Sequence, residues 1–163
     1  MELSWWSAIF GVLILALCFM PFWLMHMKNK KREGDMLNYL KELSNQHYGN
    51  IHSYEFCGDF AIGVDLNNRK LYFVKQLQNE LLKQTVSLAD VQTCRYLKHT
   101  RSVDSESGKM NVTEAIELQF LPKGKSAQEQ KLQLYSEDVN NQLSGELQFA
   151  EKWSKQINDW LKA

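Results

Sequence analysis

The 163-residue sequence lacks a surplus of charge of either sign, because 19 basic side chains balance 19 acidic ones. The balance stays near zero after residue 34, where 15 basic and 17 acidic residues remain. Nucleic-acid binding requires a basic surface that neutralises phosphates. We therefore expect no nucleic-acid partner. A chain of this length holds one ordinary domain with a single hydrophobic core.

The sequence also lacks the short motifs that carry catalytic or cofactor chemistry. No G-x-S-x-G, Walker, H-E-x-x-H or G-x-G-x-x-G pattern occurs. The three cysteines form no C-x-x-C pair, and the four histidines have no metal-ligand spacing. We therefore expect no catalytic residue, no metal and no cofactor, and we predict that the protein is not an enzyme.

Charge is absent from residues 3–27, which contain no Asp, Glu, Lys or Arg. A bilayer core about 30 Å thick takes about 20 apolar residues in a helix. Trp5 and Trp6 stand near one end of the run and Trp23 near the other, as interfacial aromatic belts require. The run predicts one uncleaved transmembrane helix over residues 3–27, with the lipid bilayer as its partner.

Three other interpretations of this run fit its residues less well. A cleaved signal peptide carries positive charge before the run and small residues at its cleavage site, but only Glu2 precedes this one. A lipoprotein anchor needs a small residue before its cysteine, whereas Leu17 precedes Cys18. A buried helix of a globular protein seldom has 25 consecutive uncharged residues.

A basic cluster over residues 28–32 directly follows the run. The positive-inside rule places the C-terminal side of the predicted span in the cytoplasm. We therefore predict a single-pass protein of the inner (plasma) membrane with a cytoplasmic domain. The predicted membrane-interface residues are Trp5, Trp6, Trp23, Lys28, Lys30, Lys31 and Arg32.

The hydrophobic period divides the chain into three parts. Residues 1–34 hold the predicted span and its basic flank. Apolar side chains three and four residues apart predict a short linking helix over residues 35–48. From residue 49 to 163 the pattern indicates a β domain, and Asn67-Asn68 predicts a hairpin turn between two of its strands.

Most of the domain shows the alternation of apolar and polar residues that is typical of strands. The sequence predicts strands over residues 51–57, 59–66, 70–76, 85–88, 91–97, 113–121 and 131–135. Residues 77–84 are polar and ambiguous, and residues 99–112 have so few apolar side chains that they predict a long exposed loop. One apolar stripe over residues 143–161 predicts an amphipathic C-terminal helix that docks on the sheet, with its tryptophans in the core.

Six or seven antiparallel strands closed by one C-terminal helix resemble the element order of a pleckstrin-homology-like barrel. Residues 60–74, followed by Val86-Ser-Leu-Ala-Asp-Val, resemble small bacterial domains of that superfold. The resemblance implies an α+β, mostly β fold with the barrel over residues 49–163. Eukaryotic members often bind phosphoinositides through basic residues around the first hairpin, where this chain has Arg69 and Lys70.

The tether and the missing catalytic motifs predict a membrane-anchored cytoplasmic interaction module. We expect it to bind a membrane or cytoplasmic protein within a membrane-associated assembly. Strand addition to an open sheet edge is the expected binding mode. Two alternatives stay open: sensing of anionic lipid at the inner leaflet, and an enzyme with an unrecognised site.

Overall fold

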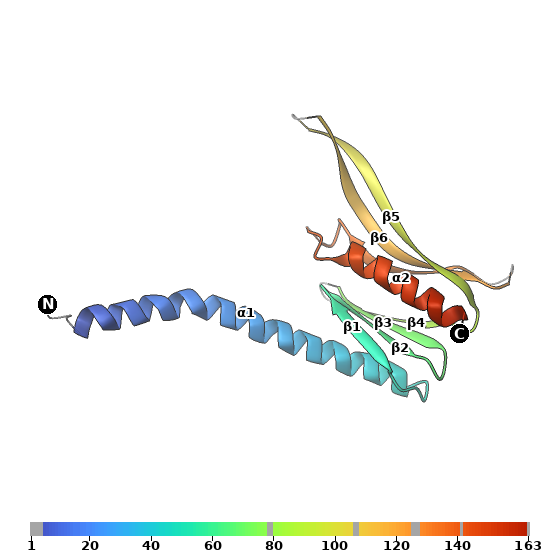
Figure 1. Ribbon diagram of the computed structural model, residues 1–163, viewed down its shortest axis with the longest axis horizontal. Helices are drawn as coiled ribbons and strands as arrows, with labels where there is room; N and C mark the ends of the chain where they lie inside the picture. Colours follow the sequence, from blue (N-terminus) through green and yellow to red (C-terminus); the bar gives the residue numbers. More distant parts are fainter. Residues whose placement is uncertain (1–4, 78–79, 106–107, 125–127, 141, 163) are drawn as a thin grey trace. The chain divides into compact units, whose positions relative to one another are not determined.

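The structure, a computed structural model, describes residues 5–77, 80–105, 108–124, 128–140 and 142–162 (Figure 1). The chain divides into two compact units, Met1–Leu37 and Asn38–Ala163. Helix α1, Trp5–Asn45, is one helix of 41 residues. The predicted linking helix is therefore the last part of α1, which continues through Gly34 without a break.

The predicted membrane span requires a correction. Along the part of the chain that the structure describes, no helix has both the length and the apolar character needed to cross a bilayer. This finding contradicts the transmembrane helix predicted over residues 3–27 and, with it, the predicted location as a single-pass membrane protein.

Two antiparallel sheets and one helix follow α1 in the C-terminal unit. The first sheet has four strands in sequence order and the second has three. The bounds are β1 Ser53–Cys57, β2 Phe60–Asp65, β3 Lys70–Gln76, β4 Leu81–Ser87, β5 Val91–Ser105, β6 Gly108–Pro122, β7 Gln130–Ser136 and α2 Glu146–Lys162. The fold is thus mostly β, as the alternating pattern indicates.

The predicted closed barrel is wrong. Among the described residues, β4 pairs only with β3 and β5 pairs only with β6, so no strand pairing joins the two sheets. Side chains take the place of strand pairing at the sheet edges. The amide of Asn158 on α2 brackets Cys94 on β5, since Nδ2 donates to the Cys94 carbonyl at 2.7 Å and Oδ1 accepts from its N–H at 2.9 Å.

The hairpin predicted at Asn67-Asn68 is confirmed, because β2 and β3 pair in register from Asp65↔Lys70 onward. The long loop predicted over residues 99–112 is wrong. β5 and β6 continue through this region as a paired ribbon, from Thr100↔Thr113 to Ser105↔Gly108. Neither face of the ribbon lies in the core, so the sequence shows no apolar alternation there.

The core lies between the two sheets and α2. Phe149, Ala150, Trp153 and Ile157 form the buried stripe of α2, and the Phe149 ring meets Phe60 of β2 edge to face at 5.0 Å between ring centroids. Trp153 is 1% exposed, which confirms its predicted core position. Truncation of a buried tryptophan side chain to alanine typically lowers the free energy of unfolding by roughly 3–5 kcal/mol. α2 therefore holds both sheets together, since it also contacts β5, β6 and β7.

Candidate functional site

Among the described residues, no third strand lies beside the distal part of the β5–β6 hairpin. β7 pairs with β6 only from Ala115 to Phe120, so residues 100–105 and 108–113 form a two-stranded ribbon by themselves. We call these residues the arm. A two-stranded hairpin is marginally stable at best in water, and both of its backbone edges are available for pairing.

The arm has two chemically different faces. Residues directly opposite in an antiparallel pair share a face, and the register places Val103 opposite Met110 and Arg101 opposite Val112. Val103 is 36% exposed and Met110 is 61% exposed. The other face is polar, and it consists of Ser102, Asp104, Lys109 and Asn111. The arm is therefore amphipathic, and its more apolar face exposes Val103 and Met110.

The base of the arm is held by charge. Arg101 donates from Nη2 to Glu137 Oε1 at 2.7 Å, and its Nε lies 3.6 Å from Glu114 Oε1. Both partners raise the pKa of the Arg101 guanidinium. Glu137 also donates its backbone N–H to the Glu114 carbonyl at 2.8 Å. These contacts fix where the arm leaves the three-stranded sheet.

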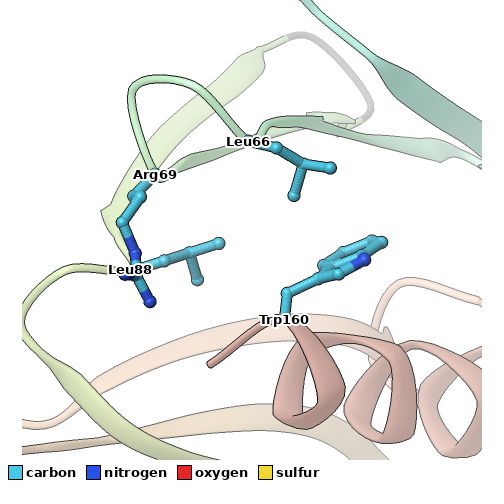
Figure 2. A pocket seen from close by; sticks show the side chains of 4 residues that line it. All are labelled: Leu66, Arg69, Leu88 and Trp160. Carbon is cyan, nitrogen blue, oxygen red and sulfur yellow. The ribbon is translucent and has the colours of Figure 1, made fainter. Parts of the chain in front are cut away.

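A second feature is a hollow of about 260 Å³ lined by Leu66, Arg69, Leu88 and Trp160. We call it the Arg69 hollow. Figure 2 shows that the four side chains border one common space, with Leu66 and Trp160 facing each other across it. Leu88 is almost fully buried and forms an apolar part of the lining, whereas Leu66 is 40% exposed. The hollow thus combines three apolar side chains with one cation.

The turn that carries Leu66 and Arg69 is held by the buried carboxylate of Asp65. The Asp65 oxygens accept hydrogen bonds from the backbone of Asn67, Asn68 and Asn50 and from the Asn68 side chain, at 2.8–3.1 Å. Burial by itself raises the pKa of Asp65, but these hydrogen bonds outweigh it and hold the pKa below its usual value. The ionised carboxylate is therefore an integral part of the turn.

Arg69 occupies an unusual backbone conformation. Its φ is +49°, in the left-handed region that glycine and asparagine adopt at least cost. Its carbonyl accepts from the Leu88 N–H at 2.7 Å, which fixes the residue beside the lining of the hollow. An observed backbone strain at an exposed side chain is grounds for a functional hypothesis.

The buried charges elsewhere have structural partners. Lys75 donates from Nζ to the carbonyls of Gln133 at 3.2 Å and Leu134 at 3.0 Å, and it lies 3.9 Å from Asp59 Oδ2. Burial lowers the pKa of Lys75, while the carboxylates of Asp59 and Glu146 act in the opposite direction. Lys75 thus links the two sheets through its hydrogen bonds to β7.

The thiols of Cys57 and Cys94 are poorly suited to catalysis. Burial raises the pKa of Cys94 to about 12. Burial, with the carboxylates of Glu146, Asp59 and Glu55, raises the pKa of Cys57 to about 11. The thiolate is the reactive species, so both side chains stay protonated. Within the described ranges, no three His, Cys, Asp or Glu side chains are placed to hold a metal ion.

The structure does not test the interface role predicted for seven residues near the N-terminus. Lys30, Lys31 and Arg32 are exposed on α1. The side chains of Trp5, Trp6, Trp23 and Lys28 lie outside the described part of the structure. Sequence reasoning did not single out the arm, and it predicted Trp160 as a core residue, whereas Trp160 is only partly buried against the core. Leu66 and Arg69 lie on the turn that the sequence predicted at Asn67-Asn68, but Leu88, directly after β4, and Trp160 of α2 are brought to the hollow only by the fold.

No protein-family model, curated protein or solved structure matches this chain. The resemblance to pleckstrin-homology-like domains therefore stays a prediction based on the order of the elements. The arm and the Arg69 hollow are exposed features with a defined chemistry.

Proposed function

We propose that this protein is a protein-interaction module that binds its partner through the apolar face of the arm. The observation that carries the proposal is the cross-strand pair Val103↔Met110, both exposed on a ribbon without a third strand. Contiguous exposed apolar surface is typical of protein-interaction sites. The proposal concerns the C-terminal unit and does not depend on a membrane anchor.

The opposite face of the arm carries polar and charged side chains. Asp104 and Lys109 are directly opposite each other, and charged side chains at edges discourage indiscriminate pairing. Ser102 Oγ lies 2.8 Å from Asn111 Oδ1 across the same face. A partner that covers Val103 and Met110 leaves these polar groups in water. One face of the arm thus binds the partner, and the charges on the other face discourage indiscriminate pairing.

Site-specific photo-cross-linking of the full-length chain tests the proposal. A photo-reactive side chain at position 110 reports on the apolar face, and one at the neighbouring position 111 reports on the polar face. We expect position 110 to give a discrete protein adduct in the producing cells and position 111 to give little. Val103→Asp in the same chain should abolish the adduct by placing a charge in the contact.

The matched control is Ser102→Asp, which adds the same charge to the opposite face. It should leave the adduct from position 110 intact. Equal adducts from both positions, or an adduct from position 110 that survives Val103→Asp, would contradict binding through the apolar face. If neither position gave an adduct, that result would also contradict it.

A further inference from the structure

We propose that the Arg69 hollow is a second binding site, which takes the C-terminal residue of a protein partner with an apolar side chain. The apolar side chain of that C-terminal residue packs between Leu66, Leu88 and Trp160, and its terminal carboxylate pairs with the Arg69 guanidinium (Figure 2). The site is separate from the arm and does not rest on the function proposed for it.

The size of the hollow favours a single residue. Its volume is about 260 Å³, below the roughly 300–1,000 Å³ of sites that enclose a drug-sized ligand or cofactor. The charge and the apolar surface border the same small space, so the ligand must carry both groups close together. A C-terminal residue does so, because its side chain and its carboxylate are bonded to one Cα.

The charge of the site favours a carboxylate. Within the part of the chain that the structure describes, no acidic side chain lies within 4.0 Å of the Arg69 guanidinium, so its planar donor set is unpaired. Arginine and carboxylate form short, often bidentate hydrogen bonds. A phosphoinositide headgroup takes several cations, whereas the lining of the hollow supplies one.

The walls of the hollow are fixed before any ligand arrives. Asp65 holds the turn that presents Leu66 and Arg69, through its bonds to Asn67 and Asn68. Trp160 stands against Trp153 of the core, edge to face at 5.9 Å between ring centroids. Because the backbone that carries Leu66 and Arg69 is already held, little backbone entropy is lost when the ligand binds.

Isothermal titration calorimetry of the full-length chain tests the site. The probe is the tetrapeptide Gly-Ser-Ser-Leu with a free C-terminal carboxylate, and its first comparison is the same peptide as a C-terminal amide. We expect the free acid to bind with a Kd of order 0.1–1 mM, as suits a ligand of this size. Amidation and Arg69→Gln should each weaken binding roughly tenfold to a hundredfold.

Two further variants separate binding from folding. Arg69→Gly removes the guanidinium but suits the positive φ, so it should lose binding while the chain stays folded. Arg95→Gln removes one exposed positive charge from β5 and should bind like the parent chain. Equal binding of acid and amide, or full binding by Arg69→Gly, would overturn the proposal.

A third peptide, Gly-Ser-Leu-Asp with a C-terminal amide, distinguishes the source of the carboxylate. Weaker binding of this peptide than of the free acid supports recognition of a chain terminus. Tighter binding would overturn it and assign the hollow to an internal acidic segment. Failure of all three peptides to bind would overturn the site altogether, without bearing on the arm.

Discussion

The Lys75 ammonium group on β3 donates a hydrogen bond to the Leu134 carbonyl on β7, 3.0 Å away in the other sheet. Leu134 has no opposite residue on β6, because the register shifts between Tyr135 and Gln133. The irregular backbone at this bulge therefore finds its donor in a side chain from the facing sheet. A group that usually lies on protein surfaces here links two layers of the core.

We expect Lys75→Met to lower the free energy of unfolding by about 2–4 kcal/mol. The substitution preserves most of the side-chain volume but leaves the carbonyls of Gln133 and Leu134 unpaired and Asp59 without its cation. Urea titration measures the change. Lys98→Met on the exposed part of β5 is the control. Adding Asp59→Asn should recover part of the loss, and no recovery would contradict the charge pairing.

Gly49→Ala tests the tight packing around Asp65. A Cβ at this position would lie 2.7 Å from Asp65 Oδ2, 2.7 Å from Tyr72 Oη and 2.9 Å from Ser44 Oγ. We expect a loss of about 1–3 kcal/mol in the free energy of unfolding, as in other overpacked sites. Gly124→Ala is the matched control, because no atom lies within 4 Å of its added Cβ. Equal effects of both substitutions would contradict the close packing.

The stability of the β2–β3 turn should depend on pH through Asp65. Its pKa in the folded state is lower than the ordinary value of 3.8. On acidification, Asp65 of the unfolded chain is therefore protonated first. The ionised Asp65 carboxylate contributes its full stabilisation above pH 3.8, and this contribution is lost as the pH falls through the folded-state pKa.

Asp65→Asn should accordingly lower the free energy of unfolding at pH 7 by about 1–3 kcal/mol. The difference from the parent chain should shrink as pH falls from about 5 to about 2, and thermal unfolding at several pH values measures it. The exposed Asp104→Asn is the control. A difference that stays constant with pH would show that the Asp65 charge does not hold the turn.

Arg69→Gly should make the fold as stable as the parent chain or more stable by up to about 1 kcal/mol, since glycine relieves the positive φ. Thermal unfolding measures this change independently of any ligand. Arg69→Gln keeps the backbone strain and should leave the melting temperature unchanged. A loss of more than about 1 kcal/mol with glycine would mean that the Arg69 side chain stabilises the fold.

Replacing residues 102–111 by Asn-Gly should shorten the arm without disturbing the core. The replacement joins Arg101 to Val112, which are opposite each other, through a turn dipeptide suited to hairpins. Because the removed residues with described side chains are exposed, the midpoint of urea unfolding should change little. A large loss of stability would show that the arm packs on the rest of the unit and is not a free ribbon.

Local chemistry made several elements predictable. Asn67 and Asn68 indicated the β2–β3 turn, and the apolar residues of Ile116, Leu118 and Phe120 indicated a strand that lies within β6. The stripe through Trp153 and Ile157 likewise indicated α2. Each of these segments has one face in the core, so the hydrophobic period is visible in the residues themselves.

The wrong predictions concern segments and strand pairings that leave no such hydrophobic period in the sequence. The arm was predicted as a loop because both of its faces avoid the core, which removes the period-two signal even though the backbone is paired. β4 lies within a region that was partly ambiguous because most of its side chains are only half-buried. The closed barrel was predicted from strand count, whereas closure depends on which edges pair.

The mostly β composition, the balanced charge and the helical C-terminus follow from composition and local period alone. The packing of distant elements, by contrast, makes Lys75 join two sheets, Asn158 bracket β5, and Arg69 border one hollow with Leu66, Leu88 and Trp160. Such contacts join residues far apart in the chain. Their formation depends on the packing of whole sheets and on α2, which no local pattern of residues records.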